Sequence, residues 1–202
     1  MKPLLGEAID LVFLMDRSGS MGGSETDTIG GFNAYLQREK KKDFETYVTT
    51  ILFDDMYEVL YQRKPINEVS ELTEKEYWVR GCTALFDAIG KTIHTLDSKT
   101  SNKVLFVIMT DGLENSSREY TKQQIINLIN DHNWEFVFIG ADIDSYSEAH
   151  GIGIDKSRTA NYKKSRDSID KVFHSIENLS YDMRMDRPAS DEWKDELREY
   201  DD

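Results

Sequence analysis

An aspartate and two serines follow the first apolar stretch of the sequence at alternate positions. Residues 9–15 form a run typical of a buried strand, and Asp16, Ser18 and Ser20 come directly after it. The carboxyl end of a strand is where open α/β sheets bind their ligands. Carboxylate and hydroxyl oxygens suit Mg²⁺, Mn²⁺ or Ca²⁺ better than they suit zinc. The pattern therefore predicts part of a site for a hard divalent cation.

Two later segments carry oxygen donors at equivalent places. Thr83 lies just before a predicted helix, and Asp111 lies just after the most apolar strand, between a threonine and a glycine. Because parallel strands of a doubly wound sheet end at one edge, Asp16 and Asp111 can meet there if their strands are neighbours. Each residue also has an ordinary role open to it, since Asp16 and Thr83 can cap helices and Asp111 can begin a turn. The order and placement of the three segments favour a shared metal site.

Short apolar runs alternate with helical patterns, as in βα units around a mostly parallel sheet. The predicted strands cover residues 9–15, 47–53, 58–63, 103–110, 134–140 and a short stretch near 157–160, and the predicted helices cover 24–41, 85–96, 121–132, 145–150 and 163–185. The second and third strands are too close for a helical crossover, so they should form a hairpin. We expect an α/β fold with a doubly wound sheet of about six strands, one antiparallel edge strand and helices on both faces.

The composition indicates one globular domain and a short tail. The chain has 202 residues, of which 39% are hydrophobic and 31% charged, enough for a sizeable core. Residues 1–185 form the predicted domain. Residues 186–202 read as an acidic tail, partly disordered or loosely helical, because few of them are apolar.

The net charge and the cysteine content limit the expected partners and the expected cellular compartment of the protein. The net charge of −13 disfavours nucleic acid and anionic membranes as partners and favours cations and basic partners. The single cysteine, Cys82, excludes an internal disulfide and is expected to be a small residue packed in its loop. No export signal or membrane-spanning run is evident, so we expect a cytoplasmic protein.

Together the three segments resemble the metal-ion-dependent adhesion site (MIDAS) of von Willebrand factor A domains. The resemblance covers about residues 8–185, and all five family ligand positions have the matching residue, namely Asp16, Ser18, Ser20, Thr83 and Asp111. It implies a Rossmann-like fold with Mg²⁺, or alternatively Mn²⁺ or Ca²⁺, in the upper crevice. It also implies a protein-binding module rather than an enzyme. In such a module the cation keeps a position open for a Glu or Asp of the partner protein.

Two other classes of function stay open. A metal-dependent hydrolase or phosphatase also places aspartates at the end of a parallel strand. However, a haloacid dehalogenase-type enzyme requires a second carboxylate where Ser18 stands, and the sequence has neither a phosphate-binding loop nor a nucleophile elbow. A structural subunit that recruits an ATPase or a stress-response complex fits the same residues. No pattern indicates an oligomeric state.

For some residues near these motifs the sequence gives a less specific indication of their role. Asp142 and Asp144 follow another strand, where turn and cap roles are favoured over lining the crevice. Glu114 and Asn115 read as a solvated loop, with a role at the rim of the site as the alternative. Arg17 cannot be a metal ligand and is expected either to pair with an acid of the partner or to lie in solvent.

Overall fold

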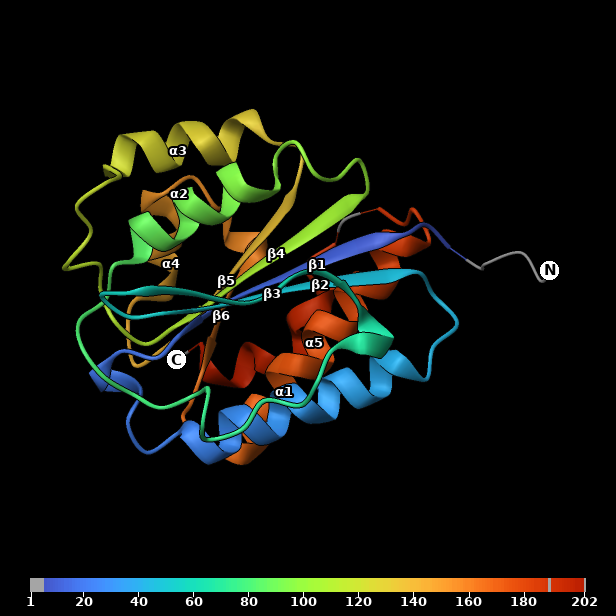
Figure 1. The fold of residues 1–202 in the computed structure, drawn as a ribbon, viewed down its shortest axis with the longest axis horizontal. Coiled ribbons are helices and arrows are strands. Elements are labelled where there is room, and N and C mark those ends of the chain that lie inside the picture. Colours follow the sequence, from blue (N-terminus) through green and yellow to red (C-terminus); the bar gives the residue numbers. More distant parts are fainter. Residues whose placement is uncertain (1–5, 189, 202) are drawn as a thin grey trace.

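The computed structural model describes residues 6–188 and 190–201, which form a six-stranded sheet with helices on both faces (Figure 1). Residues 1–5 of the predicted domain, and 189 and 202 of the predicted tail, lie outside the described residues. The strands are β1 (Ile9–Asp16), β2 (Thr46–Phe53), β3 (Tyr57–Pro65), β4 (Lys103–Thr110), β5 (Glu135–Ala141) and β6 (Thr159–Tyr162). All neighbouring pairs are parallel except β2 and β3, so β3 is an antiparallel edge strand. The predicted fold class is confirmed.

The direction in which the chain adds strands to the sheet reverses between β1 and β4. The strand order is β3-β2-β1-β4-β5-β6, so the chain runs outward from β1 to β3 and then returns to place β4 on the free side of β1. This reversal is the switch point at which such sheets bind ligands. Asp16 is the last residue of β1 and Asp111 follows the last residue of β4, so both carboxylates lie at this point.

The helices divide between the two faces of the sheet (Figure 1). One face carries α1 (Glu25–Lys40) and α5 (Arg166–Arg184), and the other carries α2 (Leu85–Leu96), α3 (Lys122–Asp131) and α4 (Ser145–Gly151). Successive side chains of β1 serve both layers: Phe13 belongs to the core under α1 and α5, and Leu14 belongs to the core under α2. A central strand covered in this way must be apolar on both sides, which explains its unbroken burial.

Three short 3-10 helices were not predicted, namely η1 (Gly19–Met21), η2 (Ile66–Glu68) and η3 (Lys156–Arg158), whereas η4 (Glu192–Tyr200) lies in the segment expected to be partly disordered or loosely helical. The helix expected over 163–185 begins later, at Arg166, because the Ser165 side chain caps it by accepting a hydrogen bond from the Ser168 N–H. No helix within residues 6–188 and 190–201 combines the length and the apolarity that a membrane crossing needs.

The segment after Asp186 packs against the domain, so the expectation that it has too few apolar residues to bury is wrong. Trp193 and Leu197, four residues apart in η4, are both buried in the core under α5. Lys194 is buried as well, and its Nζ donates to the Thr159 carbonyl oxygen at 2.6 Å. Two large apolar anchors and a satisfied ammonium are enough to hold a short segment in place.

We predict opposite effects for two adjacent glycines of α1. A Cβ atom on Gly31 would lie 2.6 Å from Ile169 Cγ2 and 2.9 Å from a ring carbon of Phe173, whereas a Cβ atom on Gly30 meets nothing within 4 Å. Gly31→Ala should therefore force α1 and α5 apart and lower the free energy of unfolding by about 1–3 kcal/mol. Gly30→Ala should raise it by up to about 1 kcal/mol, because alanine favours the helix. Urea unfolding followed by circular dichroism measures both, and equal stability of the two variants would contradict the close packing.

Candidate metal centre

Asp16 is completely buried, and both of its carboxylate oxygens accept hydrogen bonds. Oδ1 accepts from the Ser18 backbone N–H at 2.6 Å, and Oδ2 accepts from the Thr110 hydroxyl at 2.6 Å. Burial raises the pKa of Asp16 to about 6, against the opposing effect of these hydrogen bonds, and the charge of Asp111 adds to the rise. A carboxylate so poorly solvated is stabilised strongly by a cation beside it.

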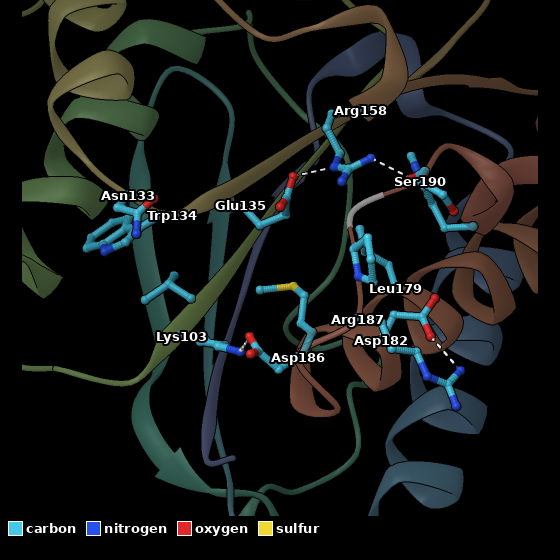
Figure 2. Close-up of a pocket in the computed structure, with 14 residues that line it drawn as sticks. Lys103, Asn133, Trp134, Glu135, Arg158, Leu179, Asp182, Asp186, Arg187 and Ser190 are labelled. Atoms are coloured by element: carbon cyan, nitrogen blue, oxygen red, sulfur yellow. Dashed lines mark hydrogen bonds and ion pairs between the residues drawn. The ribbon is translucent and has the colours of Figure 1, made fainter. Parts of the chain in front are cut away.

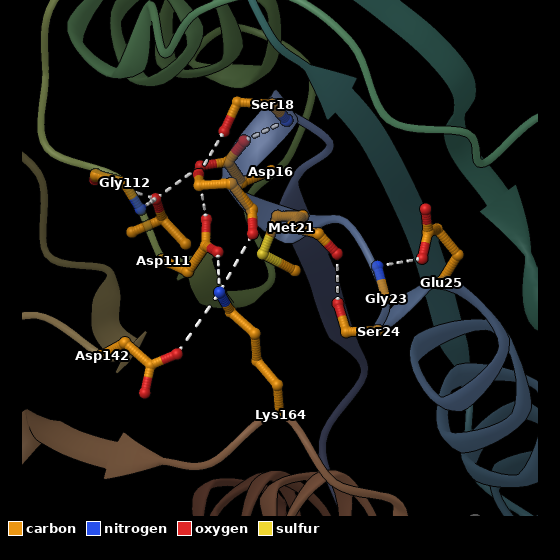
Figure 3. A network of polar contacts seen from close by, with 12 residues as sticks. Asp16, Ser18, Met21, Gly23, Ser24, Glu25, Asp111, Gly112, Asp142 and Lys164 are labelled. Atoms are coloured by element: carbon orange, nitrogen blue, oxygen red, sulfur yellow. Dashed lines mark hydrogen bonds and ion pairs between the residues drawn. The ribbon is translucent and has the colours of Figure 1, made fainter.

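Ser18, Ser20 and Asp111 form a chain of contacts beside Asp16, and Figure 3 labels Ser18, Asp111 and Asp16. The Ser18 and Ser20 hydroxyl oxygens are 3.1 Å apart, and Ser20 Oγ donates to Asp111 Oδ1 at 2.6 Å. Ser18 immediately precedes η1, and the turn of this short helix brings the two hydroxyls together. The side chain of Asp111 is 0% exposed, so a second buried carboxylate completes the chain.

Thr83 joins this group because a glycine leaves room for its hydroxyl. A Cβ atom on Gly112 would be 2.6 Å from Thr83 Oγ1 and 3.4 Å from Ser20 Oγ, so a larger residue would push the hydroxyls away. The Thr83 N–H donates to Asn115 Oδ1 at 2.9 Å, which ties the two loops together. The structure thus brings all five predicted residues to one place, namely Asp16, Ser18, Ser20, Thr83 and Asp111.

The donor set of this site fits a hard divalent cation. All five side chains offer oxygen, and two are carboxylates whose charge balances a divalent ion. The described residues contain no group of three or more His, Cys, Asp and Glu side chains that could hold a metal, so this site depends on its hydroxyls. The buried Asp111 Oδ2 lies 2.5 Å from the ammonium of a lysine. An acceptor in that state is well suited to a positive charge.

A lysine that the sequence did not single out reaches into the site (Figure 3). Lys164 Nζ lies 2.5 Å from Asp111 Oδ2 and 3.3 Å from Asp142 Oδ2. Lys164 follows β6, the edge strand beside β5, and a lysine pair before a helix normally reads as solvated surface. Only the placement of β6 in the sheet brings it to Asp111, so no local sequence signal could have identified it.

The acidic residues near the motifs make specific contacts in the structure. Asp144 caps α4, as expected, by accepting from the Ser147 N–H. Asp142 has the expected turn role, since it lies in a bend with a φ of 56°, and its carboxylate also lies 3.3 Å from Lys164 Nζ. Glu114 is not a solvated loop residue, because its carboxylate accepts hydrogen bonds from the Phe86 N–H of α2 and from the N–H groups of Ser116 and Ser117 in its own loop.

Arg17 neither faces a partner nor lies in solvent, so both expectations for it are wrong. Its side chain is 1% exposed and pairs with Asp54 at 2.9 Å and with Glu58 at 2.8 Å. Asp54 also pairs with Arg80 at 2.8 Å. These ion pairs tie the end of β1 to the β2–β3 hairpin and hold the loop that carries Ser18.

Cys82 is exposed, which corrects its expected packing within the loop. The neighbouring Thr83 is buried, so the chain turns inward between the two residues.

The comparisons with known proteins agree with this geometry. The family model described as von Willebrand factor type A domain matches residues 10–175. Among solved structures, the chain is similar to proximal thread matrix protein 1 from the mussel byssus with a zinc-occupied MIDAS motif, with a TM-score of 0.66 and 16% identity over 87% of this chain and 46% of that one. No curated protein sequence matches the chain significantly.

Two bacterial proteins have the same fold. The von Willebrand factor domain of the type V pili tip protein Mfa5 from Porphyromonas gingivalis has a TM-score of 0.60 and 9% identity, over 87% of this chain and 96% of that one. A mutant of the PilB minor pilin from Streptococcus sanguinis has a TM-score of 0.63 and 12% identity, over 92% of this chain and 64% of that one. The chain spans just under half the length of the mussel protein, and identities this low show the fold alone.

We predict that Asp87 in α2 stabilises the loop beyond Asp111 in a pH-dependent way. Its carboxylate accepts from the N–H groups of residues 118, 119 and 120, each at 2.9 Å. Burial alone would raise the pKa of Asp87, but these three donors hold it below its ordinary value of 3.8. Asp87→Asn should lower the free energy of unfolding by about 1–3 kcal/mol at pH 7.

The sign of this pH effect follows from the lowered pKa. The stabilisation by Asp87 is fully present above pH 3.8, its ordinary pKa, and disappears as the pH falls through its lower value in the folded protein. Urea unfolding of both proteins from pH 7 downward should show their difference shrinking only at acid pH. Asp97→Asn, at the exposed end of the same helix, is the control and should change stability by about 0.5 kcal/mol or less. A difference that persists unchanged below pH 3 would contradict the charged role of Asp87.

Proposed function

Since this chain belongs to the von Willebrand factor type A domain family, we propose that it captures an acidic residue of a partner protein through a divalent cation. The observation that carries the proposal is the convergence of three hydroxyls and two buried carboxylates at the switch point of the sheet. The proposed cation is Mg²⁺, and Mn²⁺ or Ca²⁺ have the same ligand preferences.

The five donors would share the work of holding the ion. Asp16 and Asp111 balance its charge, and the hydroxyls of Ser18, Ser20 and Thr83 complete the set without adding charge. When bound, the cation supplies a positive centre that a carboxylate from outside can neutralise. The hydrogen bonds to Asp16 and the small size of Gly112 keep the donors in position for that purpose.

The loops around the site support a protein as the partner. Met56, Trp78 and Leu113 are 59%, 45% and 54% exposed, and each belongs to a loop at the carboxyl edge of the sheet. The guanidinium of Arg80 lies 4.7 Å from the centre of the Trp78 ring, which orients this large side chain. Large apolar side chains exposed beside a charged site are typical of protein-binding surfaces.

Binding is also a better description than catalysis. The mussel and pilus proteins that share the fold are named as matrix, tip and pilin proteins, and none is named as an enzyme. The hydroxyls and carboxylates of this site are arranged as donors to one ion, and no histidine belongs to the set. A phosphatase would need a nucleophile or a general base in addition to these ligands.

We predict that the protein binds Mg²⁺ or Mn²⁺ through Asp16 and Asp111. Isothermal titration calorimetry with Mg²⁺, Mn²⁺, Ca²⁺ and Zn²⁺ should give one site per chain, and Asp16→Ala or Asp111→Asn should abolish it. Saturating cation should also raise the melting temperature of the wild type, by an amount equivalent to about 2.7 kcal/mol at 100 times the dissociation constant. Asp155→Asn is a matched control at the opposite edge of the sheet, before β6, and should bind like the wild type. Cation binding that survives in Asp111→Asn would place the site elsewhere.

Partner capture should depend on the same residues. A protein partner recovered on immobilised wild-type chain in Mg²⁺ should be lost on adding a chelator and should be absent from Asp111→Asn, because the bridge requires the cation. Recovery on Asp155→Asn should be unchanged. Capture that persists in the chelator would assign recognition to another surface, and phosphoester hydrolysis that vanishes in Asp111→Asn would favour the enzyme class.

A further inference from the structure

Lys164 makes the contacts of a cation inside the candidate metal centre (Figure 3). Three oxygens surround its Nζ, namely Asp111 Oδ2 at 2.5 Å, the Ser20 carbonyl oxygen at 3.0 Å and Asp142 Oδ2 at 3.3 Å. An ammonium group has three donors, which is enough for one contact with each of these oxygens. Two of the three belong to residues of the proposed donor set.

The ammonium and a divalent cation would compete for the carboxylate of Asp111. The Asp111 side chain is 0% exposed and that of Lys164 is 24% exposed, so water screens the pair poorly. A divalent ion held by Asp111 while Lys164 stays in contact would put positive charges on two sides of one buried carboxylate. Their mutual repulsion is strong in such a site and opposes simultaneous contact of both with Asp111.

Asp142 offers the ammonium an alternative position. Its side chain is 63% exposed and already lies 3.3 Å from Lys164 Nζ. The backbone on both sides is anchored to α5, because the Lys163 N–H donates to Ser168 Oγ at 2.9 Å and Ser165 caps the helix. The Lys164 side chain can therefore swing toward Asp142 and solvent without a movement of its loop.

We propose that Lys164 is an intramolecular competitor of the divalent cation, whose ammonium holds Asp111 until cation binding displaces it toward Asp142. The inference rests on the proposed function, since it concerns the same donor set. It assigns to Lys164 the compensation of the buried negative charge of Asp111. It also means that Lys164 raises the apparent dissociation constant of the site for the cation.

Calorimetric titration of the full chain with Mg²⁺ and with Mn²⁺ tests the competition in the wild type, Lys164→Met and Lys163→Met. Removal of the competing ammonium should tighten cation binding about tenfold or more, the order by which one nearby charge shifts an equilibrium. Lys163→Met removes the same charge one residue away, where Nζ lies over the Tyr200 ring, and should leave the affinity unchanged. Comparison with Lys163→Met separates the specific effect of Lys164 on cation affinity from the general effect of a change in net charge.

A second measurement uses the unaltered protein. The acylation rate of the Lys164 amine by a water-soluble ester, followed by mass spectrometry with Lys163 as the internal reference, should rise when Mg²⁺ is added, because a displaced ammonium is more accessible. This readout does not require Lys164→Met to fold. An acylation rate that Mg²⁺ leaves unchanged, in a protein that calorimetry shows to bind Mg²⁺, overturns the inference.

The outcomes separate the inference from the proposed function. Equal affinities of the wild type and Lys164→Met, or weaker binding by the variant, overturn the competition while leaving the metal site intact. Absence of cation binding to all three proteins overturns the proposed function, and the inference with it. Tighter binding by both Lys164→Met and Lys163→Met would reduce the effect to net charge and also overturn the competition.

Discussion

The burial of two carboxylates side by side at the switch point of the sheet constrains the rest of this structure. Asp16 ends β1 and Asp111 directly follows the neighbouring β4, and their like charges are withdrawn from water that would otherwise screen them. Such a pair is tolerated only where hydrogen-bond donors and positive charge compensate it. The hydrogen-bond donors are the Thr110 hydroxyl, the Ser18 N–H and the Ser20 hydroxyl. The positive charge is the ammonium of Lys164. A site that the fold must neutralise in this way is already prepared for a cation.

The loops that carry the donors are held from outside the site. Arg17 and Asp54 fix the end of β1 against the β2–β3 hairpin, while Asn115 and Glu114 fasten the Asp111 loop to the start of α2. These contacts leave large apolar side chains on the same loops exposed, Trp78 among them. Rigid donors surrounded by exposed apolar groups form an arrangement suited to docking a protein.

The fold itself does not decide this function. A mussel byssus protein and bacterial pilus proteins share the architecture at identities of 9–16%. At identities this low, the proteins share the arrangement of the sheet and its helices, and the chemistry of each depends on the side chains at the edge of its sheet. In this chain Lys164 is such a side chain, since it adds a cation of its own to a donor set that also suits a metal.

The sequence alone determined the elements and the composition of the site. Apolar runs and helical periodicity depend on neighbouring residues, so the strand over 103–110 and the helix over 85–96 were predicted at their observed boundaries. The Asp-x-Ser-x-Ser and Thr-Asp-Gly patterns likewise follow their strands directly, which is why Asp16, Ser20 and Asp111 could be grouped.

Tertiary structure decided the partners of the charged and apolar residues far from those patterns. Arg17 was expected at the surface but is buried against the hairpin, and Trp193 was assigned to a loose tail but anchors η4 in the core. Lys164 meets Asp111 only because β6 follows β5 in the sheet. The physical reason is the same in each case. A lone charge or a lone aromatic carries no periodicity, so its environment is set by which distant segment the fold places beside it.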